Sequence, residues 1–311
     1  MKNQLILFCC LFASSLAAQQ LSTNRLYREQ LNVQNPAAFS REYIFETNTT
    51  VFGISHRQQW VGVEDAPMNT SVCLELVDAE ALPVVGGGGF WGVHDRTGKL
   101  GFSTGAVNFK AAIPLTGRRS NMEHFLSAGV ALGFTQHYFK ASEIEWKDED
   151  DPVVFNQTQA GYFDVSAGIF LYGKKERIAK SGIKGYYLGI SAPQIFEPDP
   201  DFSIDTEPVL KRKRHYFAFG GIRVKTYGES YWEPSIYFRH VENAPLSFDA
   251  NMRWKFSDLM WAGAGFGTSS AHLETGFELL DNVMKINFAY DFTWQLFYGH
   301  SIEVNATWAW R

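Results

Sequence analysis

The stretch from residue 124 to residue 139 alternates between two kinds of side chain. Large apolar residues such as Leu126 and Phe134 fall on one parity, and small or polar residues such as Ser127 and Thr135 fall on the other. Successive side chains of a β-strand point to opposite faces, so this period predicts a strand with one apolar face. The run is longer than the usual strand of about 5–6 residues and can cross a bilayer at a tilt, which takes about 9–11 residues.

The same alternation recurs along most of the chain. From Met284, for example, Ile286 and Phe288 share one face while Lys285 and Asn287 share the other. Reading the whole sequence in this way gives about fourteen candidate strands, with boundaries good to about 2–4 residues. They lie near residues 43–56, 69–78, 84–94, 98–111, 123–139, 160–173, 182–192, 213–225, 230–241, 245–256, 258–267, 269–279, 282–292 and 299–310.

Alternation alone fits both a soluble sandwich and a transmembrane barrel. In the barrel, apolar residues face lipid while polar or small residues face the lumen, and an even strand number is the rule. Long strands, an export signal and aromatic strand ends favour the barrel, so we predict an all-β, transmembrane antiparallel β-barrel of about 14 strands, of the outer-membrane type. The tryptophans expected in an interfacial girdle are Trp232, Trp254, Trp261, Trp294, Trp308 and Trp310.

The first residues, MKNQLILFCCLFASSLAAQQ, have a positive start, a short apolar core and small residues, which is the pattern of a secretory signal peptide. Cleavage after Ala17 or Ala18 fits, so residues 1–18 are assigned to the signal peptide. Residues 19–42 lack strand alternation and form an N-terminal segment that enters or caps the barrel, which takes up residues 43–311. Cleavage leaves Cys73 as the single cysteine, so no intrachain disulfide can form.

The formal net charge of −5 argues against a nucleic-acid partner. Two long acidic connections, residues 142–158 and 197–208, contrast with tight turns near the C-terminus and are assigned to the cell exterior. The KRKR run at 211–214 is expected at a barrel rim, where it would meet lipid phosphates or a partner.

Charged residues on the polar parity would be costly against lipid and are expected to pair in the lumen. A conducting or gating role for them is the alternative. They are Asp249, Arg253, Lys255, Glu274, Glu278, Lys285 and Asp291.

The sequence contains no convincing catalytic, cofactor or metal site. GGGGFWG at 86–92 includes a GxGxxG string, but no helix follows to receive a phosphate, so the glycines are read as strand residues. No HExxH, CxxC or GxSxG occurs, and the acidic stretch from Glu145 lacks the spacing of an EF-hand. We therefore predict a protein that is not an enzyme and takes no cofactor; a barrel enzyme acting on lipids is the weakest alternative.

The stretch ISHRQQWVGVEDAP at 54–67 gathers several polar side chains at the end of the first long strand. Arg57 and Gln59 share a parity that points to the lumen or rim, whereas Trp60 falls on the parity of an interfacial anchor. Pro67 suits the start of the next strand, where a missing N–H is tolerated. An alternative is that Arg57, Gln59, Trp60 and Pro67 form a docking surface for a partner.

With Asn35-Pro36-Ala37 upstream and Ala66-Pro67 and Thr70 downstream, this stretch resembles the PorP/SprF family. The likeness continues through EPSIYFRH, INFAYDFT and GHSIEVNATW and covers nearly the whole mature chain. Asp65 stands where the family has Gly, an extra Asn69 precedes Thr70, and Gly299 to Glu303 depart from the Ser-His-Glu of the family. These departures bear more on partner contacts than on the fold.

The resemblance implies an outer-membrane barrel of Bacteroidetes that serves the type IX secretion system and is linked to gliding motility. It would aid the export or surface retention of one large secreted or adhesin-like client protein. Expected partners are this client, other type IX secretion components and the lipids of the outer membrane. The alternative is a general pore for small solutes, whose selectivity the lumen charges would set.

Overall fold

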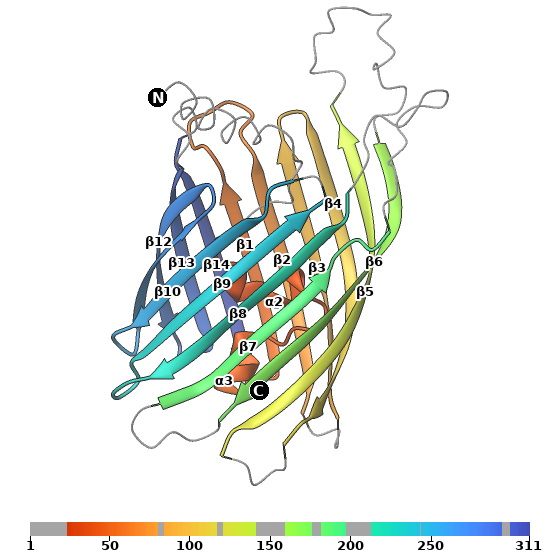
Figure 1. Ribbon diagram of the computed structural model, residues 1–311. Coiled ribbons are helices and arrows are strands. Elements are labelled where there is room, and N and C mark those ends of the chain that lie inside the picture. Colours follow the sequence, from red (N-terminus) through yellow and green to blue (C-terminus); the bar gives the residue numbers. More distant parts are fainter. Residues whose placement is uncertain are drawn as a thin grey trace, which may run out of the picture.

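The computed structural model describes residues 24–79, 84–116, 121–140, 159–175, 182–196, 213–242, 244–293 and 299–311. Its described residues form one closed barrel of fourteen antiparallel strands, each paired with its neighbours in sequence, and β1 closes the ring against β14 (Figure 1). This confirms the predicted fold class and strand number. The strands are β1 (Thr50–Gln58), β2 (Met68–Asp78), β3 (Val85–Thr97), β4 (Leu100–Pro114), β5 (Glu123–Phe139), β6 (Gln159–Lys174), β7 (Gly182–Ala192), β8 (His215–Lys225), β9 (Tyr231–Val241), β10 (Ser247–Lys255), β11 (Met260–Gly267), β12 (Ser270–Leu279), β13 (Met284–Thr293) and β14 (Ser301–Trp310).

The two ends of the barrel differ in their connections. The longest ones, residues 140–158 and 193–214, both follow odd-numbered strands and therefore share one end, which we call the long-loop end. The opposite, short-turn end carries connections such as 256–259 and 280–283 together with the C-terminus. The two acidic loops that were predicted to lie at the cell exterior, residues 142–158 and 197–208, lie outside the described part of the chain.

The predicted alternation holds along the strands. In β5, Leu126, Val130 and Leu132 point outward and are exposed, whereas Ser127 and Ala131 point inward and are buried. Outward apolar side chains are what a lipid-facing wall requires. Among the described residues, no helix is both long and apolar enough to cross a membrane.

An aromatic cluster marks the short-turn end of the outer wall. Trp232 and Trp254 stack with ring centroids 5.3 Å apart, and Trp308 packs on Phe52 at 5.8 Å. Trp310 is also exposed there, as the girdle prediction requires. Trp261 was predicted wrongly: it is only 1% exposed, because it shares parity with Gly263 and Gly265 and points into the lumen. Trp294 lies outside the described residues.

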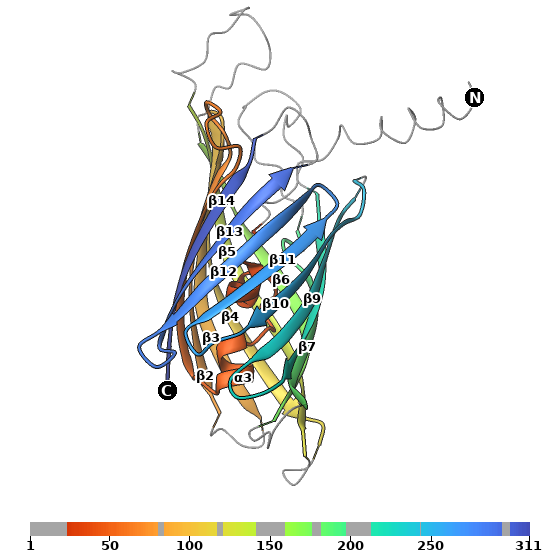
Figure 2. The ribbon, with the colours of Figure 1, turned by 90° about the vertical axis from the view of Figure 1, so that its left-hand side faces the viewer.

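The lumen contains the chain's own N-terminal residues. Two short helices and a 3-10 turn, namely η2 (Tyr27–Gln30), α2 (Leu31–Gln34) and α3 (Arg41–Glu46), lie within the ring of strands in both views (Figures 1 and 2). We call residues 24–46 the lumenal segment. The first strand was predicted to begin at residue 43, but β1 begins at Thr50, because α3 takes up the preceding residues. The predicted signal peptide, residues 1–18, lies outside the described part of the chain.

Candidate functional site

The lumenal segment runs down the barrel from the long-loop end to the short-turn end. Its last helix, α3, begins where the Ser40 side chain accepts a hydrogen bond from the Tyr43 amide at 3.2 Å, which is a standard N-cap. It ends at Thr47, whose left-handed backbone (φ 63°) turns the chain toward β1. Helices of four to six residues are not stable alone, so the contacts with the barrel wall must hold the segment in place.

Arg25 fixes the segment at the long-loop end. Its guanidinium donates to Asp291 at 2.8 Å and also to Asp249 and Ser270. The backbone amide of Arg25 donates to the Glu303 carboxylate at 2.7 Å. One arginine thus joins β10, β12 and β13, and its amide reaches β14.

Arg41 and Glu29 form the centre of the charged network. The Arg41 guanidinium binds Glu233 through two hydrogen bonds of 2.7 and 2.8 Å, and it binds Glu29 at 2.8 and 2.9 Å. Glu29 also accepts from Arg253 of β10 at 2.6 Å. Planar, bidentate pairs of this kind are the strong ones. Arg28, fully buried, pairs with Glu274 of β12.

Glu29 belongs to the lumenal segment and not to a strand, and its ionisation is tied to this network. Burial acts to raise its pKa, but the nearby Arg41 and Arg253 outweigh burial and bring the pKa down to about 2. Glu29 therefore stays charged, and paired, at any physiological pH.

Two further carboxylates hold the segment at the short-turn end. Glu42 accepts from Lys285 of β13 at 2.7 Å. Glu46 accepts from Arg223 of β8 at 2.5 Å and from Lys184 of β7 at 3.2 Å. The segment is thus anchored by ion pairs at both ends and in the middle of the barrel.

The turn at Asn35-Pro36-Ala37 docks on strand glycines. The Asn35 amide donates to the carbonyl oxygens of Ile169 and Ile190, both at 3.1 Å, and so joins β6 to β7. A Cβ on Gly168 would lie 2.0 Å from Asn35 Oδ1. On β5, a Cβ on Gly129 would lie 2.5 Å from the Pro36 carbonyl oxygen. These glycines leave the space that this turn fills.

The lumen wall is divided into a charged side and an aromatic side. Strands β9 to β14 carry most of the charges described above, whereas β5 to β9 present aromatic rings to the segment. Phe39 and Tyr43, for example, lie 5.2 and 6.2 Å from the Tyr172 ring between centroids. This buried cluster comprises Tyr27, Leu31, Ala37, Ala38, Phe39, Tyr43, Ile44, Phe45, Val77, Val85, Ala112, Phe125, Phe170, Tyr172, Tyr187, Phe217, Phe219 and Tyr237.

Cys73 lies on the lumen face of β2 and is 2% exposed. The Cys73 sulfur and the Gln30 side chain converge on Gly53 of β1: a Cβ there would lie 3.1 Å from Cys73 Sγ and 3.4 Å from Gln30 Nε2. The lumenal segment therefore covers this thiol.

The predicted lumen charges are all buried and paired in the lumen. Of these seven residues, Lys255 and Glu278 form an ion pair with each other, between two strands. The other five form ion pairs with the lumenal segment, and Asp291 also pairs with Arg57 of β1. The strand pattern gave no sign that Arg25, Arg28, Glu29, Arg41 and Glu42 are the partners of these charges. The sequence does hold a sign of their role. These five charged residues occur together with the apolar Leu26, Tyr27 and Leu31 in a segment that was expected to enter or cap the barrel.

The four residues of the predicted rim motif lie in two places. Arg57 is buried in the lumen, where it binds Asp291 and lies 3.6 Å from Glu303. Gln59, Trp60 and Pro67 lie in the β1–β2 connection at the long-loop end, where the backbone N–H of Gln59 donates to the Pro67 carbonyl oxygen at 2.9 Å. Pro67 directly precedes β2, as expected. A docking role for these residues stays a prediction.

Within the described ranges, no group of three or more His, Cys, Asp or Glu side chains is placed to hold a metal ion. The lumenal carboxylates described above are engaged by arginine or lysine. The arrangement is suited to holding a segment in place.

Comparison with known proteins identifies the family. The model of the family described as "Type IX secretion system membrane protein PorP/SprF" matches residues 16–307. No curated protein sequence matches the chain. Similar solved structures include a deltaS2 mutant of the TodX monoaromatic hydrocarbon channel (12% identity, 90% of this chain and 94% of that chain covered, TM-score 0.48) and the β domain of the Bordetella autotransporter BrkA (12%, 85% and 98%, 0.40). Salmonella typhi OmpF in complex with daunomycin is a third (10%, 85% and 98%, 0.34). The family match spans almost the whole sequence, and this outer-membrane barrel therefore belongs to the PorP/SprF family of type IX secretion system membrane proteins.

Proposed function

We propose that this protein is an accessory barrel of the type IX secretion system that aids the export or surface retention of one dedicated large client protein. The family supports a secretion role. The observation that carries the finer proposal is the occupied lumen. A barrel filled by its own chain offers its rim and outer wall to partners, and so acts by binding.

The energetics of the lumen disfavour passage of a polypeptide. Moving the lumenal segment out would separate Arg25, Arg28 and Arg41 from buried carboxylates. Breaking one buried pair by removing a partner costs about 3–5 kcal/mol. The same cost opposes the alternative function, a general pore for small solutes, which would need the segment to leave or shrink.

The β1–β2 connection at the long-loop end supplies a candidate docking surface. Trp60 and Asp65 adopt left-handed backbone conformations (φ 45° and 55°). Asp tolerates this conformation, whereas it is strained for the bulky Trp60, and such strain concentrates at functional sites. Val61 and Val63 expose apolar side chains in the same connection. We propose that Gln59, Trp60 and Pro67 contact the client or another secretion component, and that Arg57 holds β1 in place from the lumen side.

The test is a comparison of secreted and surface proteins between the wild type and a deletion strain. We expect one or a few large proteins to disappear from the medium and cell surface and to accumulate inside. Complementation with Trp60→Ala should restore secretion only in part, whereas Tyr227→Ala, which alters an exposed residue at the short-turn end, should restore it fully.

The alternative function gives a different pattern. An unchanged secretome together with reduced uptake of a small solute would refute the secretion role and support a pore. Full rescue by the Trp60→Ala variant would leave the secretion role standing but would refute the docking role of this connection.

A further inference from the structure

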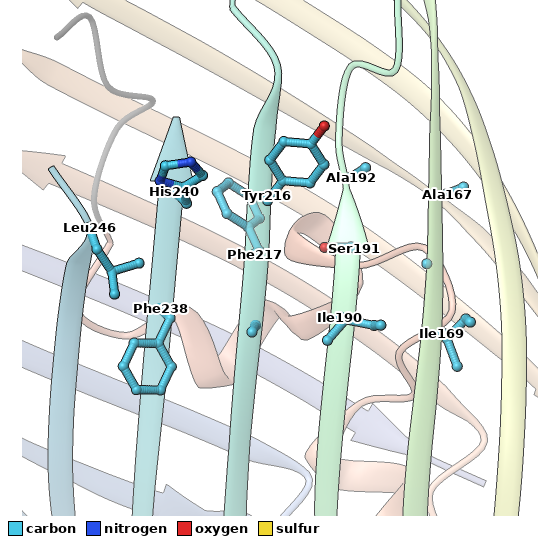
Figure 3. A pocket seen from close by; sticks show the side chains of 12 residues that line it. Ala167, Ile169, Ile190, Ser191, Ala192, Tyr216, Phe217, Phe238, His240 and Leu246 are labelled. Atoms are coloured by element: carbon cyan, nitrogen blue, oxygen red, sulfur yellow. The ribbon is translucent and has the colours of Figure 1, made fainter. Parts of the chain in front are cut away.

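Strand β6 continues past the end of its neighbour β7 at the long-loop end. β6 has 16 residues and β7 has 11, and a strand needs about 9–11 residues to cross a bilayer. The last pair that joins them at this end is Ala167 and Ala192, which lie side by side on the wall (Figure 3). Residues 159–166 of β6 therefore extend beyond β7, and among the described strands none runs so far past a neighbour.

The chain that follows β7 is drawn away from this part of β6. Gln194 adopts a left-handed backbone conformation (φ 61°), which ends the extended course of β7. The backbone N–H of Gln194 then donates to the Ser166 hydroxyl at 3.4 Å, and that of Phe196 donates to the Asp164 carboxylate at 3.2 Å. Both acceptors are on the lumen face of β6, so the chain turns toward the lumen and does not continue the sheet.

The backbone of β6 presents hydrogen-bonding groups at this place. The Val165 carbonyl oxygen accepts from the backbone N–H of Ile195 at 2.8 Å, so the odd-numbered residues of β6 turn their N–H and C=O groups to the β7 side. Gly161 and Phe163 have the same parity, and within the described part of the chain nothing hydrogen-bonds to their groups on that side. We call residues 159–164 the open edge.

The open edge lies beyond the hydrocarbon of the membrane. Outward side chains beside it are polar: Gln136 of β5 donates to Gln159 at 2.8 Å, and His94 Nδ1 lies 2.9 Å from Ser103 Oγ. Such groups are costly against lipid tails, so the lipid boundary lies nearer to Phe163, whose apolar ring is 81% exposed. Backbone groups in lipid would stay unsatisfied, whereas those in water are solvated and within reach of a partner.

The chemistry of an open edge selects an extended backbone. Alternating N–H and C=O groups pair with another strand, which is the mode of recognition called strand addition. Edges that stay unpaired usually carry lysine or proline, whereas this one reads QAGYFD. Phe163 is on its outer face and Asp164 on its lumen face, so a partner strand with alternating apolar and polar residues matches it.

A second copy of this chain does not fit the open edge. Two copies in one membrane share one orientation, so a two-fold axis along the membrane normal relates them. Strands of such barrels tilt by about 35–45°, and this axis would cross the two β6 strands at roughly twice that angle instead of aligning them. The open edge therefore suits a strand from a different protein.

We propose that the open edge of β6 binds the client protein by strand addition. An extended client segment pairs with the backbone of Gly161 and Phe163, and its apolar side chains pack against the Phe163 ring. The identity of the partner rests on the proposed function above, whereas the pairing rests on the edge itself. This contact gives a barrel with a filled lumen a place to hold a protein at its long-loop end.

The first test compares two substitutions at one position in the mature protein in detergent. Phe163→Val and Phe163→Pro both remove the ring, but only proline also removes the N–H on the open side, and proline is tolerated on strand edges. The probe is a peptide in which valine and threonine alternate, and the control peptide is the same with all its backbone nitrogens methylated. Phe163→Pro should bind the probe about fivefold more weakly than Phe163→Val, as expected for the loss of one backbone hydrogen bond.

Hydrogen exchange at the open edge shows what covers it. In the protein alone, the Gly161 and Phe163 amides should exchange at least about tenfold faster than the Ser166 amide, which faces β5, and the probe should slow them. Heat-modifiable mobility on gels checks that each variant is folded. Protection of these amides without the probe would show that the protein's own chain or a second copy covers the edge, and would overturn the proposal. Equal binding of the two peptides, or of the probe by the two variants, would overturn it as well.

In cells, the same two variants separate this inference from the proposed function. In the deletion strain, Phe163→Val should restore the client at the cell surface, whereas Phe163→Pro should leave it several-fold lower. If deletion removes the client and both variants restore it equally, the proposed function stands and the open edge is not the client's site. If deletion leaves the secretome unchanged, the proposed function fails and the client is not the partner, while the peptide experiment still decides whether the edge accepts a strand.

Discussion

Replacing Arg41 with methionine should loosen the lumenal segment without removing it. Arg41 is fully buried and binds both Glu29 and Glu233. Methionine keeps the volume of the side-chain stem but leaves two carboxylates with fewer partners.

The magnitude follows from the partners that remain. Removing one member of a buried pair costs about 3–5 kcal/mol. Glu29 keeps Arg253 and Glu233 keeps Arg223, so the lower value applies, and about 3 kcal/mol corresponds to a roughly 100-fold rise in the open fraction.

The native thiol of Cys73 reports this opening. With the chain expressed from residue 19, Cys73 is its single cysteine, and the lumenal segment covers it. When opening and closing are fast compared with labelling, the labelling rate tracks the open population. A water-soluble thiol reagent should therefore label folded Arg41→Met about 100-fold faster than the wild type.

Three controls make the experiment decisive. Cys73→Ser should show no labelling, and unfolded protein gives the limiting rate. Lys99→Met breaks a half-exposed pair with Asp65 that is worth only about 0–1 kcal/mol, so its rate should stay close to that of the wild type. If folded Arg41→Met is labelled at the wild-type rate, the ion pairs do not hold the segment and the reasoning is wrong.

Two other predictions concern the same segment. Gly168→Val would place a Cβ 2.0 Å from Asn35 Oδ1. Overpacking of this kind costs about 1–3 kcal/mol, so the rate of Cys73 labelling should rise at least several-fold. A Cβ at Gly105 meets nothing within 4 Å, so the control variant Gly105→Val should be labelled at the wild-type rate. The pKa of Glu29 is about 2, below its ordinary value of 4.5, so its stabilising effect is complete above pH 4.5 and is lost only as the pH falls through 2. Conductance across planar bilayers should accordingly stay low and constant from pH 8 down to pH 5, and a reversible increase between pH 7 and pH 5 would contradict the assignment of Glu29.

The barrel was predictable because its two environments impose a period of two on every strand. Leu126 faces lipid and Ser127 faces the lumen, and a shift of the strand register by one residue would exchange the two environments. The same logic predicted burial of Asp249, Arg253 and Lys285 in the lumen. It did not predict their partners, because a periodic pattern carries no information about what fills the ring.

The lumenal segment was only partly predictable. Its helices are too short to show a period of 3.6, and its contacts join residues more than 200 positions apart, such as Arg25 and Asp291. Trp261 was misassigned for a related reason. Tryptophan is common at a membrane interface, but its ring also binds cations in a buried site. Here the guanidinium carbon of Arg253 lies 3.5 Å from the centroid of the Trp261 ring, which is a cation–π contact.

The position of the lumenal segment sets the order in which the protein must assemble. Arg25 lies near the start of the chain, whereas its partners lie on the last strands, β10, β12, β13 and β14. The separation from Glu303 is 278 residues. Contacts between residues so far apart in the sequence form late and slowly during folding. A ring already sealed between β1 and β14 would have to admit a charged segment through its interior. The N-terminal residues therefore have to lie between the strands before β1 and β14 pair, so that the last hairpins close around them.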